Sequence, residues 1–212
     1  MKMNGKKLIA VTAALLLAVV MVGAAAADTI NPLPVKTDIN KLEDRFVTTD
    51  IEYKGNGKAA MTLYENELFD ADTIKAAKAG DVIVSDGQEV TVETVDWDGP
   101  DLYFNKGTDN EMLFCDNSDG TFNHVYHDED DRIPQAKIGT IDVEILPYIT
   151  MLDWVDPKTG DSLDKVAVRD GDELKALLEG KEGPSFSVKN VRTLFDNNNQ
   201  PVLVWRYYSP AQ

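Results

Sequence analysis

Turn signals between short alternating segments restrict the fold of this chain more than any other feature. Asp86-Gly87 is the clearest signal, because an Asp-Gly pair favours a two-residue hairpin turn with positive φ. Four pairs of segments are predicted to form hairpins on such signals: 46–53 with 58–64, 81–85 with 88–96, 110–116 with 121–127, and 186–195 with 202–208. These segments do not alternate with the helical crossovers that parallel strands need, so we expect antiparallel sheets.

The run Asn117-Ser118-Asp119-Gly120 also predicts the register of its hairpin. If Asn117 lies opposite Thr121, four apolar side chains share one face of the ribbon, and a shift by one residue would break up that face. These side chains are Met112, Phe114, Phe122 and Tyr126. The same register places Cys115 opposite Asn123, on the face away from His124.

Three further segments suggest short helices, and one suggests a long strand. Residues 37–46 fit one or two helical turns, and residues 170–180 fit an amphipathic helix capped by Asp170. Residues 70–79 fit a helix capped by Asp70 or Asp72 and ended by Gly80. Residues 136–146 alternate as a strand does, and 148–165 is expected to be a partly ordered connection with a turn at 156–160.

These elements predict an α+β fold that is mostly β. Antiparallel hairpins would form a curved sheet or a partly open barrel with two or three short helices. Residues 41–212 are expected to form a single β-rich domain, and a division into two lobes near 147–165 stays open. Residues 28–40, with two prolines in a short polar setting, are expected to be an extended lead-in.

The first 27 residues have the pattern of a secretory signal peptide. Three lysines precede an uncharged stretch from 8 to 27 that ends in small residues, which predicts cleavage after Ala27. The alternative is an uncleaved membrane anchor, because about 20 apolar residues span a bilayer. We therefore expect a protein that is secreted or held at the cell envelope, with membrane contact only through this segment if it is retained.

The charge balance argues against two classes of partner. The chain has 37 acidic and 21 basic side chains, and loss of three lysines with the signal segment would leave 18 − 37 = −19. Nucleic acids and anionic lipids are disfavoured, because they bind through clustered Lys and Arg and no such cluster occurs in the sequence. An unknown protein or glycan at the cell envelope remains as partner.

An acidic run offers a candidate metal site, and calcium is the cofactor it suggests. His127 is followed by Asp128, Glu129, Asp130 and Asp131. Carboxylate oxygens suit calcium, a hard cation. A solvated acidic loop is the simpler interpretation, because runs of like charge are usually exposed.

Two arrangements would fit an enzyme. Trp97, Asp98, Asp101 and Tyr103 put aromatic rings beside carboxylates in an expected loop, as in sites that bind or cleave sugars. Cys115 with a histidine could act as a nucleophile and base, but the register separates Cys115 from His124.

We therefore expect an exported, non-catalytic binding or interaction module of the cell envelope or extracellular space. Two alternatives remain at this stage. One is a secreted, glycosidase-like hydrolase with its carboxylates near Trp97, and the other is a calcium-dependent binding module.

Overall fold

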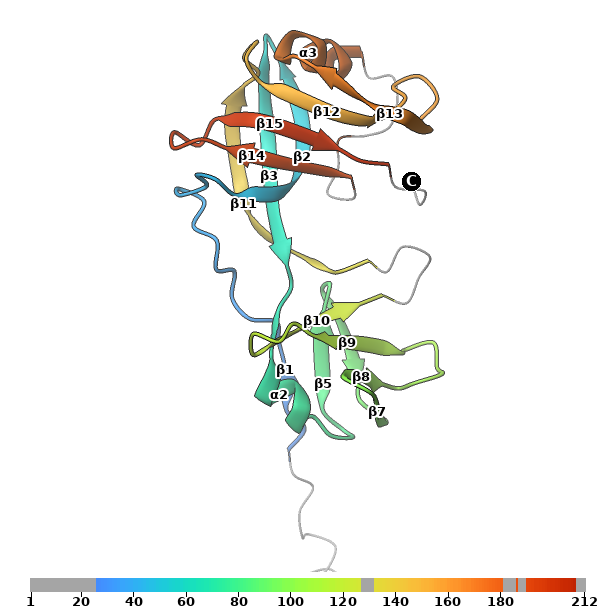
Figure 1. Ribbon diagram of the computed structural model, residues 1–212. Coiled ribbons are helices and arrows are strands. Elements are labelled where there is room, and N and C mark those ends of the chain that lie inside the picture. Colours follow the sequence, from blue (N-terminus) through green and yellow to red (C-terminus); the bar gives the residue numbers. More distant parts are fainter. Residues whose placement is uncertain (1–25, 127–131, 181–185, 187–189, 209–212) are drawn as a thin grey trace, which may run out of the picture.

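The computed structural model describes residues 26–126, 132–180, 186 and 190–208. These residues form two lobes with separate hydrophobic cores, joined by a narrower middle (Figure 1). The fold is α+β and mostly β, as predicted, and it is built from strands β1 to β15 with helices α2 and α3. None of the sheets is closed into a barrel.

The large lobe contains a seven-stranded sheet in the order β11-β3-β2-β14-β15-β12-β13, with α3 packed against it. Its strands are β2 (Phe46–Gly55), β3 (Lys58–Asn66), β11 (Gln135–Glu144), β12 (Thr150–Val155), β13 (Ser162–Arg169), β14 (Val191–Phe195) and β15 (Pro201–Arg206), and α3 is Gly171–Gly180. Neighbouring strands are antiparallel except β12 and β15. The sheet turns one face to a core that includes Leu42, Met61, Leu174 and Val204.

The small lobe contains a five-stranded sheet, a three-stranded sheet and α2. The first has the order β4 (Phe69–Asp70), β10 (Thr121–Val125), β9 (Met112–Asp116), β8 (Asp101–Phe104) and β7 (Val95–Asp98). The second has the order β1 (Thr29–Ile30), β5 (Val82–Ser85) and β6 (Gln88–Thr91), and α2 is Ala71–Ala76. Phe69, Phe104 and Phe114 pack edge to face in its core.

The predicted hairpins are confirmed, including the register around residues 117–120. Phe122 pairs with Asp116, Asn123 with Cys115, and His124 with Phe114. Phe114 and Phe122 are fully buried on one face, as the apolar pattern requires. At the β5–β6 turn both Asp86 and Gly87 have positive φ (51° and 71°), which is the geometry that favours an Asp-Gly pair.

Two of the predicted helices are also present, each with an aspartate as its cap. Asp70 Oδ1 accepts from the backbone N–H of Thr73 at the start of α2. Asp170 and Glu173 accept from each other's backbone N–H at the start of α3, which is a capping box. Helix α2 ends at Ala76 with Ala77 as its C-cap, earlier than expected, and Gly80 lies in the turn that follows.

The prediction of helical turns at 37–46 was wrong. The segment has short turns at 39–40 and at Asp44 and a bridge between Glu43 and Phe195, and no helix. A distant part of the chain forms hydrogen bonds with its backbone. The side chain of Asn199 accepts from the N–H of Leu42 at 3.0 Å and donates to the carbonyl of Ile39 at 3.2 Å. Leu42 is thereby held in the core of the large lobe, so a tertiary contact replaces the local helix.

Two segments expected to be loops or connections are strands. Residues 148–165 include β12 and the start of β13, with the predicted turn between them, and they lie inside the large lobe. The partner that orders β12 on its other side is β15, about 50 residues away in the sequence. Residues 95–104 form the β7–β8 hairpin, whose two-residue turn is Gly99-Pro100.

Three consecutive residues at and just after the end of β3 form hydrogen bonds where the two lobes meet. Glu65 accepts from the backbone of Lys36 and Thr37, in the lead-in segment. Asn66 accepts from the side chain of Gln135 at 2.6 Å, at the start of β11. Glu67 accepts from Ser85 and from the backbone of Asp86, in the β5–β6 hairpin of the small lobe.

Candidate functional site

The residues around Trp97 lie on an exposed hairpin. Trp97 is 53% exposed, and every residue of β7 is exposed. Asp98 lies opposite Asp101 in the hairpin and forms an ion pair with Lys106 at 3.2 Å. Lys106 also lies over the ring of Tyr103, 4.3 Å from its centroid. The four predicted residues are therefore neighbours, but Lys106 neutralises Asp98 and the carboxylates are not enclosed, as a glycosidase requires of its acid.

The predicted calcium ligands, His127 and 128–131, lie outside the described residues. In the part of the chain that is described, no group of three or more His, Cys, Asp or Glu side chains is arranged to hold a metal ion. The calcium hypothesis therefore stays a prediction.

Cys115 and His124 lie on opposite faces of the β9–β10 hairpin, as the register predicted. His124 is buried, and its Nδ1 lies 2.8 Å from the hydroxyl oxygen of Ser85. Ser85 in turn donates to Glu67 at 3.0 Å. A hydroxyl has one proton, so His124 must donate to Ser85 through Nδ1–H when Ser85 donates to a carboxylate.

This chain of three residues has the wrong order for a nucleophilic triad. In such a triad the imidazole lies between the carboxylate and the hydroxyl and accepts the hydroxyl proton. Here the hydroxyl lies in the middle, and Ser85 is 2% exposed. Burial lowers the pKa of His124 to about 4, so the ring is neutral near pH 7. We interpret Glu67, Ser85 and His124 as a buried link between the end of β3 and the small lobe.

A cavity of about 450 Å³ lies where the lead-in segment crosses the large lobe. We call residues 31–41 the strap, because they run from β1 of the small lobe along the molecule to the large lobe (Figure 1). The cavity, here the strap pocket, lies between the strap and the adjoining parts of β2, β3, β11 and β14. Sequence patterns did not reveal it, because its walls come from five segments that are distant in the sequence.

Three cations line the strap pocket: Lys36 from the strap, Arg45 before β2, and Arg192 on β14. All three are exposed, and none forms an ion pair with another described residue. Eight other basic residues of the described chain form ion pairs with Asp or Glu. The three cations therefore line one hollow without a direct ion pair to any carboxylate of the described residues.

Glu65 is the acidic residue in the pocket wall, and donors of the strap occupy its carboxylate. The backbone N–H groups of Lys36 and Thr37 donate to it at 2.6 and 3.1 Å, and the Thr37 hydroxyl donates at 2.5 Å. Such donors stabilise a carboxylate and offset its charge. The lining side chains carry three positive charges and one negative charge, so the pocket is locally positive.

The remaining wall combines apolar and hydrogen-bonding groups. Phe46, Val47, Leu68 and Ile138 supply apolar surface. Tyr64 donates its hydroxyl to Asp50 at 2.8 Å, and burial together with that hydrogen bond raises its pKa to about 12. A neutral phenol, positive side chains and apolar surface in one hollow suit an anionic organic group better than a metal cation.

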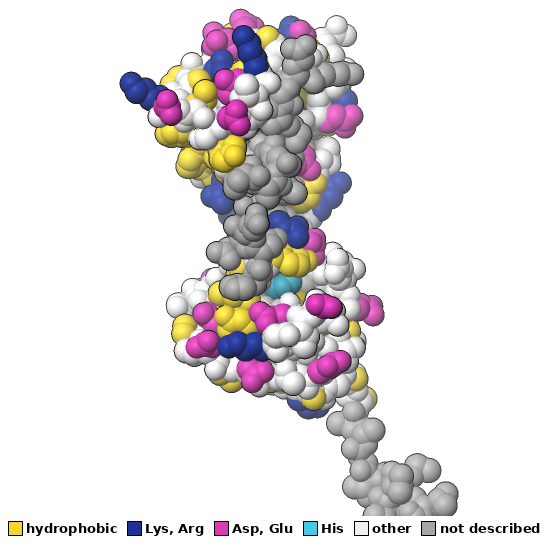
Figure 2. Space-filling view, turned by 90° about the vertical axis from the view of Figure 1, so that its right-hand side faces the viewer, with side chains coloured by type: hydrophobic (Ala, Val, Ile, Leu, Met, Phe, Trp, Pro, Cys, Tyr) yellow, Lys and Arg dark blue, Asp and Glu magenta, His cyan; other side chains and the backbone are white. Residues whose placement is uncertain are grey.

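The charge of the strap pocket is opposite to that of the whole protein. The chain has a formal net charge of −16, and acidic side chains are spread over both lobes on the face drawn in Figure 2. Lys36 and Arg45 do not form a run of basic residues, and Arg192 lies far from both in the sequence, so the sequence contains no local basic cluster. The net charge of the chain therefore did not predict a positively charged pocket.

Comparison with known proteins adds no functional information, because no family model, curated protein or solved structure matches this chain. Within the described residues, no helix is long and apolar enough to cross a membrane.

Proposed function

We propose that this protein is an exported, non-catalytic binding module of the cell envelope or extracellular space, and that the strap pocket holds an anionic group of its ligand. Export rests on the signal pattern of residues 1–27. Binding rests on one observation, the presence around a cavity of about 450 Å³ of three cations that form no ion pair with another described residue.

Two physical arguments support an anionic ligand. Arginine guanidinium groups bind carboxylates through paired hydrogen bonds, and the pocket has two of them. Bringing like charges together without a counter-charge costs free energy, and a bound anion would remove that cost. Glu65 offsets one of the three positive charges at most, so the lining keeps a net positive charge that a bound anion would balance.

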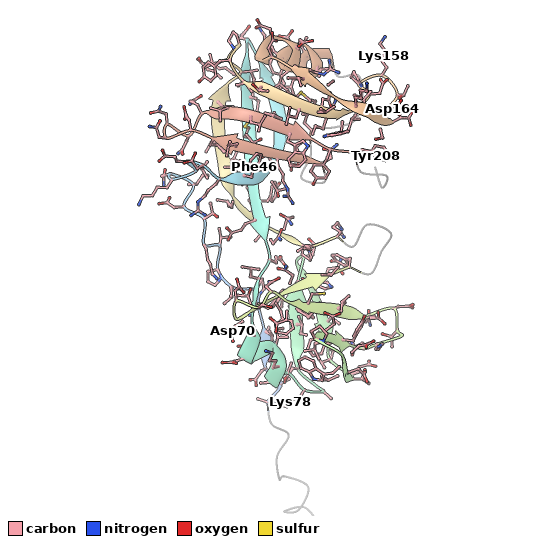
Figure 3. All side chains as sticks on the ribbon, viewed as in Figure 1. Phe46, Asp70, Lys78, Lys158, Asp164 and Tyr208 are labelled. Carbon is pink, nitrogen blue, oxygen red and sulfur yellow. The ribbon has the colours of Figure 1, made fainter. Side chains whose placement is uncertain are left out.

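The proposal is tested by binding to a mixed panel at about 0.15 M salt. The exported protein is applied to immobilised anionic and neutral polysaccharides and to acidic and basic peptides. The test variant is the double substitution Arg45→Glu/Arg192→Glu. Its control, Lys158→Glu/Lys165→Glu, changes the net charge equally at two exposed lysines. Lys158 lies away from Phe46, at the β12–β13 turn (Figure 3).

We expect the native protein and the control to retain anionic members of the panel and to release them intact. The Arg45→Glu/Arg192→Glu variant should lose them. Retention of no anionic compound, equal binding by the two variants, or recovery of a cleaved ligand would overturn the proposal.

A further inference from the structure

A row of aromatic side chains begins at the rim of the strap pocket. Phe46, which lines the pocket, is 48% exposed and meets the ring of Trp205 edge to face, with centroids 6.4 Å apart. Trp205 is 37% exposed and meets Tyr207 at the same distance and in a similar geometry. The three rings form a continuous strip.

This strip lies on the face of the seven-stranded sheet that points away from the core. On β14, Val191, Thr193 and Phe195 are buried, so Arg192 projects to the other side. On β15, Val204 and Arg206 are buried, so Trp205 projects to that side as well. The aromatic strip and the pocket therefore belong to one open surface.

Strand register places a cation directly beside the aromatic strip. Arg192 pairs with Trp205 on one side and with Thr48 on the other. Thr48 pairs with Tyr64, and Tyr64 with Lys137. With strands about 4.8 Å apart, the four steps from Lys137 to Trp205 cover about 19 Å along the sheet. Two cations, two hydroxyl groups and an aromatic ring thus lie in one row along a surface long enough for an extended ligand.

The arrangement of the strands argues against an extended peptide on this surface. A peptide that adds to a sheet needs an open edge, whose N–H and C=O groups are unpaired. Apart from Lys137, which lies on the edge strand β11, the surface lies over β3, β2, β14 and β15, each of which has a paired neighbour on both sides. A ligand must therefore be recognised through side chains alone.

We propose that this surface binds a linear, carboxylated polysaccharide, with its carboxylates at Arg45 and Arg192 and its sugar rings on Phe46 and Trp205. Sugar rings have apolar C–H faces that pack on aromatic rings, and hydroxyl edges that bond to groups such as Thr48 and Tyr64. This inference rests on the proposed function and names its ligand class. The net charge of the protein would repel such a polymer at a distance, but at 0.15 M salt that repulsion is screened beyond about 8 Å.

The test is a calorimetric titration of the exported protein with galacturonate oligomers at about 0.15 M salt. Their methyl esters keep the sugar rings and remove the charge, and glutamate oligomers keep the charge and remove the sugar rings. Trp205→Ala tests the aromatic strip. Trp97→Ala is the matched control, because Trp97 is an exposed tryptophan of the small lobe. Arg192→Gln tests the charge separately.

We expect galacturonate oligomers to bind, and esterification, Trp205→Ala and Arg192→Gln each to weaken binding by about tenfold or more. Trp97→Ala should leave binding unchanged. Glutamate oligomers that bind as tightly as galacturonate would overturn this inference and leave the proposed function standing. If the Arg45→Glu/Arg192→Glu variant bound galacturonate and glutamate oligomers as tightly as the native protein does, both this inference and the proposed function would be overturned. An unchanged affinity for galacturonate in Trp205→Ala would show that the aromatic strip is not part of the site.

Discussion

The ion pair of Asp153 and Arg206 is buried inside the large lobe, and removal of the carboxylate should strongly destabilise the fold. Asp153 is 0% exposed and Arg206 is 1% exposed. Two nitrogens of Arg206 donate to the two carboxylate oxygens at 2.8 and 2.9 Å, and Arg169 donates at 3.0 Å. The substitution Asp153→Ala deletes these three hydrogen bonds and leaves a buried guanidinium without its counter-charge.

The expected loss is about 3–5 kcal/mol in the free energy of unfolding, which is typical when one partner of a buried pair is removed. Urea unfolding followed by tryptophan fluorescence measures it, because Trp154 and Trp205 adjoin Asp153 and Arg206 in the sequence. Asp164→Ala is the control, because Asp164 is exposed on β13 of the same lobe and should change stability by only about 0.5 kcal/mol.

A double substitution separates the charge from the packing. Asp153→Leu/Arg206→Met removes both charges and keeps apolar volume, so it should lose clearly less stability than Asp153→Ala. The reasoning would be refuted if Asp153→Ala lost less than about 1 kcal/mol, or if the double variant lost as much as the single one.

Three further predictions concern other parts of the molecule. Burial lowers the pKa of His124 from 6.5 to about 4, so the unfolded chain binds its proton first and stability is lost as pH falls through that window. The stability difference between the native protein and His124→Gln should therefore shrink by about 3 kcal/mol between pH 7 and 4 in urea titrations, and a constant difference would contradict this. Gly171→Ala would put a Cβ 1.9 Å from the carbonyl oxygen of Leu146, so it should lower the melting temperature, whereas Gly180→Ala meets open space and should not. Mass spectrometry of the exported protein should find Asp28 as its first residue, and a retained Met1 would contradict cleavage.

Local signals were sufficient to predict the hairpins, because each depends on a turn and on alternation within about 20 residues. The register of β9 and β10 followed from keeping Phe114 and Phe122 on one face, and the structure confirms it. The caps of α2 and α3 were equally local. Each of these features is decided by residues close together in the chain.

Contacts between residues that are distant in the sequence could not be predicted from local patterns. Strand β12 is ordered by β15 on one side, and the turn of Leu42 is held by Asn199. The strap pocket has the same origin, since Lys36, Arg45 and Arg192 come from separate segments. Patterns in the sequence instead indicated Trp97, whose neighbours are local but exposed.

The central claim is that cations of the strap pocket and the aromatic strip form one binding surface, and NMR tests it most directly. The side-chain N–H signals of arginine and tryptophan are followed while a galacturonate trimer is added to the exported protein. The signals of Arg45, Arg192 and Trp205 should shift together along one binding curve, and that of Trp97 should stay in place. Shifts at Trp97 with unchanged signals from Arg45 and Arg192 would contradict the account.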